Sequence, residues 1–251
     1  MKFIELFAGI GGFSLGFERA GMECVGHVEI NPYAQKILLK HWPDVPVLGD
    51  VRKVKGEEFG PVDLICGGFP CQDISVAGNQ KGIKNGTRSS LFDEIIRLSR
   101  VLRPRYIVLE NIANLLNGGN GDWFEYVLGE VYKIGYDAEW EIISAAQIGA
   151  NHRRERIWIV AYPKGQRLHK DEIYAAHSPE SGIEKPEQWQ QFLSINAGNY
   201  YLENWERFEN VICGNVNGDT NRLDRLKCLG NALVPQIAEL IGNLIIENEK
   251  H

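Results

Sequence analysis

Residues 2–13 read KFIELFAGIGGF, a short apolar run that passes directly into a glycine-rich turn. Lys2–Phe7 has the length and composition of a buried strand, and Phe13–Ala20 has the apolar spacing of a helix that ends before Gly21. Glycines between a strand and a helix let the backbone approach a ligand closely, and the first helical turn offers free N–H groups. The stretch therefore predicts a ligand-binding strand–turn–helix unit, although a purely structural tight turn has the same pattern.

The same alternation of strand-like and helix-like runs continues through the first 160 residues. The expected strands are Glu23–Ile30, Val45–Asp50, Val62–Cys66, Tyr106–Leu109, Ala138–Ser144 and Arg156–Ala161. The expected helices are Pro32–Trp42, Leu91–Leu102, Trp123–Ile134 and Ile237–Ile246. Such regular alternation predicts the α/β class, with a doubly wound, mostly parallel sheet covered by helices on both faces.

The composition is that of a globular protein: of 251 residues, 44% are hydrophobic and 24% are charged. No apolar run approaches the roughly 20 residues of a membrane helix, and an acidic residue and glycines interrupt the N-terminal apolar stretch, which argues against a signal peptide. Five cysteines without a CxxC pair favour a reducing cytoplasm over a disulfide framework or a zinc site. A net charge of −6 disfavours a nucleic-acid partner unless basic residues cluster locally.

The character of the sequence changes after residue 162. Residues 1–162 are expected to form the catalytic and cofactor-binding domain. Residues 163–221 are polar and only weakly periodic, which predicts a small separate lobe (the variable lobe) or a set of long loops. Residues 222–251 regain an apolar helical pattern. We expect this last segment to pack back on the first domain.

Two carboxylates near strand ends indicate a cofactor. Glu29 closes the second expected strand, where an acidic side chain can accept both hydroxyls of a ribose. Asp50 closes the third and could accept from an adenine amino group. A dinucleotide would fit the ribose contact, but Ser14 stands where the GxGxxG pattern has its last glycine. An adenosine-bearing cofactor without phosphates suits the acidic surroundings better, which predicts S-adenosylmethionine.

Cys71 lies in the sequence GGFPCQ (residues 67–72), just after a central expected strand. The other four cysteines are expected to be small buried apolar residues. A free thiol has a pKa of about 8.5, so ionising Cys71 at neutral pH requires about 2 kcal/mol of thiolate stabilisation. Backbone N–H groups or an arginine could supply it.

Taken together, the motifs resemble those of the cytosine-5 DNA methyltransferases of bacterial and phage restriction–modification systems. They are, in order, FAGIGG at Phe7–Gly12, Glu29, Gly49-Asp50, GFPCQ at Gly68–Gln72, Glu110-Asn111, RRER at Arg153–Arg156, and Gly230-Asn231. The resemblance implies a Rossmann-like, S-adenosylmethionine-dependent domain that methylates carbon 5 of cytosine in double-stranded DNA. It further implies a covalent Cys71–carbon 6 adduct and base flipping, and it is compatible with a cognate restriction endonuclease as a partner.

The resemblance implies catalytic roles for three residues besides Cys71. Glu110 would contact N3 and the exocyclic amine of cytosine, which requires a carboxyl group that shares a proton, so burial should raise its pKa. Arg154 would hold the base carbonyl or a flanking phosphate. Arg156 is the second arginine of the family's pattern at this position. The implied cofactor-binding residues are Phe7, Ala8, Gly9, Gly11, Gly12, Glu29, Ile30, Asp50, Val51, Pro70, Leu91 and Asn231.

Residues in three segments, most of them basic, are candidate DNA contacts. The stretch Gln72–Ser90 is rich in glycine and lysine, as expected of a mobile basic loop, and the resemblance implies that it closes over the target nucleotide. The predicted DNA-binding residues are Gln72, Lys81, Lys84, Arg88, Ser89, Arg153, Arg222 and Arg225. Such local clusters would reconcile the acidic overall charge with DNA binding.

Two departures from the family pattern matter. Ile30 stands where many relatives carry tryptophan, so stacking on adenine would be weaker or purely apolar. The variable lobe has only about 60 residues, which is small for an independent domain, so it would recognise few base pairs or need a partner. Two alternatives remain open: a tRNA cytosine-5 methyltransferase, which shares these motifs, and a catalytically silent DNA-binding or regulatory protein, which the intact Cys71, Glu110 and Asn231 argue against.

Overall fold

The computed structural model describes residues 1–70, 91–148, 153–166 and 233–250. Its strands are β1 (Lys2–Leu6), β2 (Glu23–Val28), β3 (Val47–Leu48), β4 (Leu64–Gly68), β5 (Tyr106–Ile112), β6 (Tyr136–Ser144) and β7 (Glu155–Pro163). Its α-helices are α1 (Gly12–Arg19), α2 (Pro32–His41), α4 (Leu91–Leu102), α5 (Asp122–Lys133) and α9 (Pro235–Asn248). Short 3-10 helices are η1 (Val51–Lys53), η2 (Glu57–Phe59), η3 (Ala113–Leu115), η4 (Gly118–Gly121) and η5 (Ala145–Ile148).

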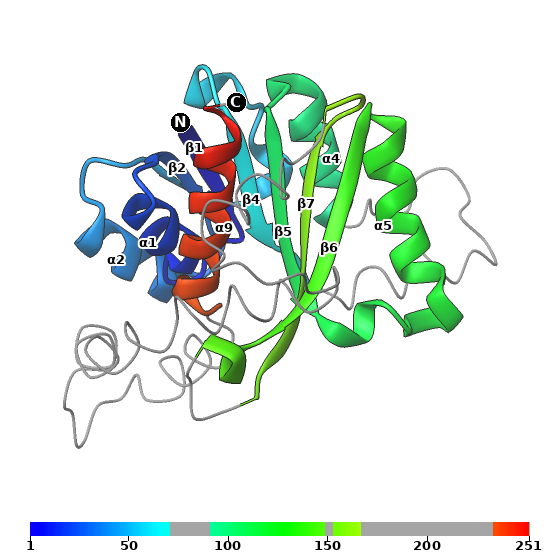
Figure 1. Cartoon of the computed structure of the whole chain (residues 1–251). Helices are drawn as coiled ribbons and strands as arrows, with labels where there is room; N and C mark the ends of the chain where they lie inside the picture. Colours follow the sequence, from blue (N-terminus) through cyan, green and yellow to red (C-terminus); the bar gives the residue numbers. More distant parts are fainter. Residues whose placement is uncertain (71–90, 149–152, 167–232, 251) are drawn as a thin grey trace.

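Within these residues the strands form one seven-stranded sheet in the order β3-β2-β1-β4-β5-β7-β6 (Figure 1). The first five are parallel, and β7 runs antiparallel to both β5 and β6. The predicted mostly parallel α/β class is therefore confirmed. The chain first builds outward from β1 to β3 and then continues on the other side of β1 with β4. In open sheets of this kind, ligands bind beyond the carboxyl ends of the strands at such a reversal.

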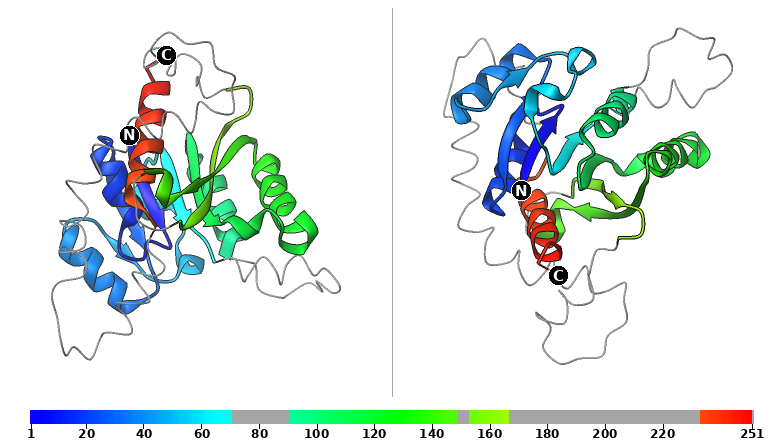
Figure 2. Two further views of the ribbon diagram at one scale, coloured as in Figure 1. Left: turned by 60° about the horizontal axis from the view of Figure 1, so that its bottom comes forward. Right: turned by 90° about the horizontal axis from the view of Figure 1, so that it is seen from above.

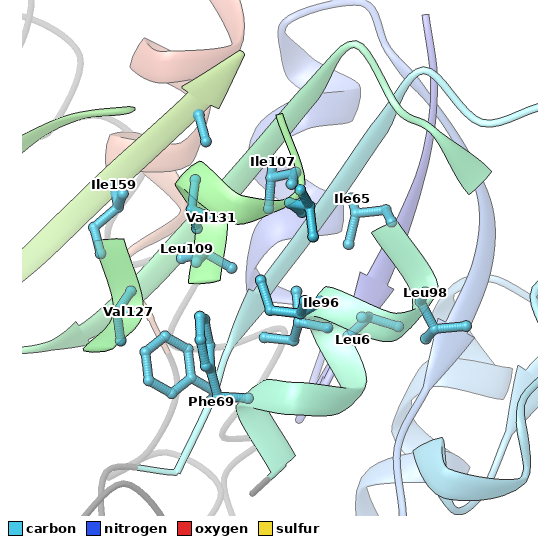
Figure 3. Packing of buried hydrophobic residues seen from close by; sticks show 14 of the residues in the cluster. Leu6, Ile65, Phe69, Ile96, Leu98, Ile107, Leu109, Val127, Val131 and Ile159 are labelled. Carbon is cyan, nitrogen blue, oxygen red and sulfur yellow. The ribbon is translucent and has the colours of Figure 1, made fainter. Parts of the chain in front are cut away.

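Helices cover both faces of the sheet. One face packs against α4 and α5, and the other packs against α1 and α9 (Figure 2, right). On the first face, Leu109 and Ile159 from the strands lie toward Val127 and Val131 of α5 (Figure 3). Alternation along β1 assigns its side chains to the two faces: Ile4 and Leu6 belong to the α4–α5 core, and Phe3 belongs to the α1–α9 core.

Helices α1 and α9 approach each other closely because glycines lie at their contact, Gly16 of α1 and Gly242 of α9. A Cβ atom at Gly16 would lie 2.3 Å from the carbonyl oxygen of Pro235 and 2.6 Å from the Cβ of Ala238. Only a residue without a side chain allows this contact. The helix predicted at Ile237–Ile246 is thus present as part of α9, which lies directly against the helix that follows the glycine turn.

The structure shifts several predicted boundaries. The third strand comprises only Val47–Leu48, because Pro46 precedes it and the Asp50 side chain caps η1 by accepting from the backbone N–H of Arg52. Strand β2 ends at Val28, so Glu29 follows the strand instead of closing it. Strand β5 extends to Ile112, because pairing with β7 continues through Ile112 and Arg156. Glu110 therefore lies within β5.

No helix in the part of the chain that the structure describes is long and apolar enough to cross a membrane. The same residues contain no group of three or more histidine, cysteine, aspartate or glutamate side chains that could hold a metal ion. Nearly all of residues 163–221 lie outside the described part of the chain. The boundaries of the variable lobe therefore remain a prediction.

Candidate active site

The glycine turn after β1 has the backbone geometry of a ligand cradle. Phe7, Gly9 and Gly11 have φ angles of 56°, 54° and 86°, all in the left-handed region that favours glycine. A Cβ at Gly11 would lie 2.4 Å from the Trp42 ring, so glycine is required there. A Cβ at Gly9 would have no described atom within 4 Å. The turn is thus packed on one side and open at Gly9.

Glu29 fixes this turn from the end of β2. One carboxylate oxygen accepts from the backbone N–H of Gly9 at 2.7 Å, and the other accepts from the backbone N–H of Asn31 at 2.7 Å. Each oxygen keeps further lone pairs, so Glu29 can also accept from ligand hydroxyls. The neighbouring Ile30 side chain is 65% exposed, an unusual state for a large aliphatic residue. An open turn, a carboxylate and an exposed apolar side chain fit the adenosine part of S-adenosylmethionine.

Asp50 lies beyond β3 but is already engaged. The Arg52 guanidinium binds both oxygens of the carboxylate, with Nη2 at 2.7 Å and Nε at 2.9 Å, and holds its pKa at about 2. Three N–H groups of Arg52 leave this carboxylate little capacity to accept from a ligand. Val51 is 4% exposed and belongs to the core. The adenine contacts of Asp50 and Val51 remain predictions.

Glu110 and Arg156 form a partly buried ion pair on the α1–α9 face. The Arg156 Nε lies 2.8 Å from the Glu110 Oε1, and neither side chain is more than 21% exposed. In the antiparallel register Glu110 pairs with Trp158, so Arg156, two residues away on β7, projects from the same face. Burial raises the pKa of Glu110, and the positive charges of Arg156 and Arg154 oppose the rise. The predicted direction of the Glu110 shift is therefore confirmed.

The adjacent end of β4 is held beside Glu110. Gly68 pairs with Glu110 in the parallel ladder, and a Cβ at Gly68 would lie 3.0 Å from the Glu110 Oε2. Asn111 is 3% exposed, and its side-chain amide donates to the carbonyl oxygen of Phe69 at 2.9 Å. Phe69 is two residues before Cys71 in the sequence. Asn111 therefore fixes the backbone from which the Pro70-Cys71 segment departs.

Several predicted site residues lie outside the described part of the chain. They are Cys71, Gln72, Lys81, Lys84, Arg88, Ser89, Arg222, Arg225 and Asn231. Of the others, Arg153 and Pro70 are exposed, and Leu91 begins α4 and packs partly against the core. Ala8 is buried, and a Cβ at Gly12 would lie 2.8 Å from the Leu233 side chain. The parts that the structure does bring together are the glycine turn with Glu29, and Glu110 with Arg156.

One group near the turn was missed by the sequence analysis. Glu5, Ser14 and His27 are each at most 1% exposed, and they are joined by hydrogen bonds directly beneath the start of α1. The available signals were an acidic residue inside an apolar strand and a serine in place of the last glycine. Neither signal reveals that the two side chains meet.

The comparisons with known proteins identify the family of this chain. A family model described as C-5 cytosine-specific DNA methylase matches residues 1–211. The chain belongs to this family. Among curated proteins of the family, it is 35% identical over 162 residues to the Type II methyltransferase M.HhaI of Haemophilus parahaemolyticus, which covers 64% of this chain and 49% of that protein.

A second relative is the Type II methyltransferase M.NlaX of Neisseria lactamica, which is 32% identical over 211 residues, covering 79% of this chain and 67% of the relative. The solved structure of a Spodoptera frugiperda DNMT2 variant is 17% identical and superposes with a TM-score of 0.64, covering 97% of this chain and 99% of that one. The similarity to this solved structure shows that the two chains share a fold. The chain spans about half the length of the first curated relatives that it matches.

Proposed function

We propose that this protein transfers a methyl group from S-adenosylmethionine to carbon 5 of cytosine in double-stranded DNA. The observation that carries the proposal is the partly buried Glu110–Arg156 pair beside Gly68, at the point where β4 leads to Pro70 and Cys71. Membership of the cytosine-5 methylase family supports the same reaction.

Glu110 is suited to exchange a proton with a bound base. Its carboxyl group is desolvated, which raises its pKa, and the positive charges of Arg156 and Arg154 oppose this rise. A group balanced in this way can stabilise a proton on cytosine N3 while the ring is attacked. Arg154, whose pKa burial lowers, directly precedes β7 and would hold a carbonyl or phosphate oxygen of the nucleotide.

Cys71 is the proposed nucleophile. Its thiolate forms a bond to carbon 6 of cytosine, the carbon 5–carbon 6 double bond opens, and Glu110 stabilises the proton at N3. Carbon 5 then forms a bond to the methyl group of S-adenosylmethionine as the sulfur–methyl bond breaks, which leaves S-adenosylhomocysteine. Loss of the proton from carbon 5 and release of the Cys71 thiolate restore the double bond, so that no oxidant or reductant is needed.

S-adenosylmethionine supplies an electrophilic methyl group to this site. The glycine turn at Phe7–Gly12 and the Glu29 carboxylate would hold its adenosine part, and the exposed Ile30 would cover the adenine ring with apolar surface. Pro70, Leu91 and Asn231 are further proposed contacts. Asp50 and Val51 are the remaining proposed contacts of the cofactor.

The DNA must present its cytosine outside the helix stack, which costs a few kcal/mol. We assign this step to the basic residues of 72–90, to Arg153 and to Arg222 and Arg225, whose contacts with phosphates would offset the cost. Residues 163–221 would read the target sequence, and residues 222–251 would return the chain to the first domain. A cytoplasmic location and a cognate endonuclease partner are part of the same proposal.

Transfer of tritium from labelled S-adenosylmethionine tests the reaction. We expect a labelled methyl group on carbon 5 of cytosine in duplex DNA. We also expect a duplex containing 5-fluorocytosine to trap a covalent complex. Cys71→Ser should abolish both while retaining S-adenosylhomocysteine binding. Cys66→Ala, which removes a buried thiol from β4, should still form the adduct. Label found in tRNA instead of DNA would contradict the proposal, as would turnover without a trapped complex.

A further inference from the structure

A closed set of polar side chains lies under the glycine turn, within the α1–α9 core. Glu5 of β1 is 1% exposed, and Ser14 of α1 and His27 of β2 are fully buried. The Ser14 Oγ lies 2.5 Å from the Glu5 Oε2 and 2.8 Å from the His27 Nε2. Buried polar groups are expensive unless each is satisfied, so such a set within an apolar core requires a reason.

Glu5 also fixes the start of α1. Its carboxylate oxygens accept from the backbone N–H of Phe13 at 3.1 Å and of Ser14 at 2.9 Å. The N-cap of this helix is Gly11, which has no side chain to cap it. Glu5 thus takes over the capping of α1 from the neighbouring strand.

The glycine turn is therefore held at both ends by carboxylates from adjacent strands. Glu29 binds the N–H of Gly9, and Glu5 binds the first turn of α1, directly after Gly11. The Gly9–Gly12 backbone lies between these two anchors. Its position depends on whether Glu5 can accept all three of its hydrogen bonds.

Two arrangements of protons are compatible with these distances. When Glu5 is ionised, the Ser14 hydroxyl donates to its carboxylate, and His27 donates from Nε2 to the Ser14 oxygen. When Glu5 is protonated, its O–H donates to the Ser14 oxygen, the Ser14 hydroxyl donates to His27 Nε2, and the histidine proton moves to Nδ1. Among the described residues, that Nδ1 atom is buried without a partner. It lacks a partner in both arrangements, as an acceptor in the first and as a donor in the second. The two arrangements differ at the cap of α1, because the neutral carboxyl of protonated Glu5 accepts more weakly from the N–H groups of Phe13 and Ser14.

We propose that Glu5, Ser14 and His27 form a proton-sharing unit that positions the glycine turn, so that cofactor affinity rises as Glu5 loses its proton. This inference rests on the proposed function, because the turn is taken to hold S-adenosylmethionine. Glu5 and Ser14 are positioning residues: they act on the cofactor through the backbone of Gly9–Gly12.

The titratable groups that face Glu5 come from two strands. From β2 these are Cys24 and His27, with Glu29 just after its end, and from β4 it is Cys66; α1 presents the Ser14 hydroxyl. Burial lowers the pKa of His27 to about 4 and raises that of Cys24 to about 12, and it also raises that of Cys66. The histidine is thus neutral and both thiols are protonated near neutral pH. Burial raises the pKa of Glu5 to about 7, where a change of pH alters its charge.

Calorimetric titration of the full chain with S-adenosylhomocysteine tests the inference. If the ionised form of Glu5 is the one that binds, affinity at pH 8 should exceed affinity at pH 6 by about tenfold, given a pKa of about 7. Glu5→Gln keeps an acceptor for the N–H groups of α1 and cannot ionise, so its affinity should not change with pH. Glu23→Gln removes an exposed carboxylate of β2 and should keep the wild-type pH profile.

Proton release provides a measurement on the wild type alone. In buffers of different ionisation enthalpy, ligand binding should release about 0.9 proton at pH 6 and about 0.1 at pH 8. The same release with 5′-methylthioadenosine, which has no group titrating in this range, would assign the proton to the protein. This readout decides the question even if Glu5→Gln does not fold.

The outcomes separate the two proposals. Binding of S-adenosylhomocysteine with the same affinity at pH 6 and pH 8, or without proton release, overturns the proton-sharing unit and leaves the proposed function standing. A pH profile retained in Glu5→Gln also overturns it. If the ligand does not bind the wild type at any pH, the proposed function fails and this inference fails with it.

Discussion

Glu110 on β5 and Arg156 on β7 are joined by an ion pair of 2.8 Å that the antiparallel register places on one face of the sheet. The residue directly opposite Glu110 is Trp158, and Arg156 reaches the carboxylate diagonally. A carboxylate carried by a parallel strand thus receives its counter-charge from the strand that runs the opposite way.

Replacing Arg156 by glutamine should leave Glu110 with less compensation for its burial. The pKa of Glu110 should then rise further, because the positive charge of Arg156 opposes the effect of burial. We expect a loss of about 1–3 kcal/mol in the free energy of unfolding at pH 8, shrinking toward pH 5 as Glu110 becomes protonated. Urea unfolding at several pH values measures this.

The double variant Glu110→Gln/Arg156→Gln provides the control for that experiment. It removes the uncompensated charge, so it should be more stable at pH 8 than Arg156→Gln alone. An Arg156→Gln defect of equal size at pH 5 and pH 8 would show that lost packing, not charge, is responsible.

The Asn111 side chain should affect the rate of covalent trapping more than the affinity for the cofactor. Asn111→Ala leaves the buried carbonyl of Phe69 without its donor and releases the backbone two residues before Cys71. We expect trapping by 5-fluorocytosine DNA to slow by about tenfold or more, since each 1.4 kcal/mol changes a rate by that factor. S-adenosylhomocysteine affinity should change less than twofold. Asn114→Ala, at an exposed position of η3, is the matched control, and an equal effect there would refute the assignment.

Gly16 should be intolerant of any side chain. Gly16→Ala would place a Cβ 2.3 Å from the Pro235 carbonyl oxygen, which forces α1 and α9 apart. Overpacking of this kind costs about 1–3 kcal/mol, and thermal unfolding should show it as a lower Tm. Gly129→Ala in α5, where no described atom lies within 4 Å of the new Cβ, should instead stabilise the protein by about 0.5–1 kcal/mol. Comparable effects at the two positions would contradict this account.

Glu5 should make the protein less stable as pH rises. Its folded pKa of about 7 exceeds the usual 4.5, so the folded state binds the proton more tightly and stability falls between about pH 4.5 and 7. The lowered pKa of His27 has the opposite effect on the pH dependence of stability. This effect is present in both the wild type and Glu5→Gln, so it cancels when the two are compared. The stability of Glu5→Gln relative to wild type should therefore rise by about 2–3 kcal/mol from pH 5 to pH 8. A constant difference in unfolding free energy across this range would refute the assignment.

The parallel part of the fold follows from local patterns in the sequence. Apolar runs bounded by glycine or proline mark β1, β4 and β5, and helical spacing marks α4, because each pattern reflects which side chains face the core. The direction of β7 does not follow from such patterns. The alternation of side chains between the two faces of β7 is the same whether the strand pairs parallel or antiparallel. The direction of β7 therefore depends on the whole sheet.

The sequence indicates candidate site residues where a single acidic residue stands at or near the end of an apolar strand. Glu29 and Glu110 are acidic residues that interrupt or follow apolar runs, and both lie at the carboxyl edge of the sheet. Their partners were less accessible from the sequence. Arg156 rather than Arg153 pairs with Glu110 because of the strand register, and the link between Glu5 and Ser14 arises only when α1 folds back over β1.

The reversal of β7 has a consequence for how this enzyme family can vary. A strand entering a parallel sheet from the opposite end brings the connection that precedes it to the edge where the parallel strands finish. Segments of different length or charge inserted between β6 and β7 would thus alter the substrate-facing rim while the hydrogen-bonded ladder stays intact. Substrate preference at this edge can diversify without any redesign of the interior.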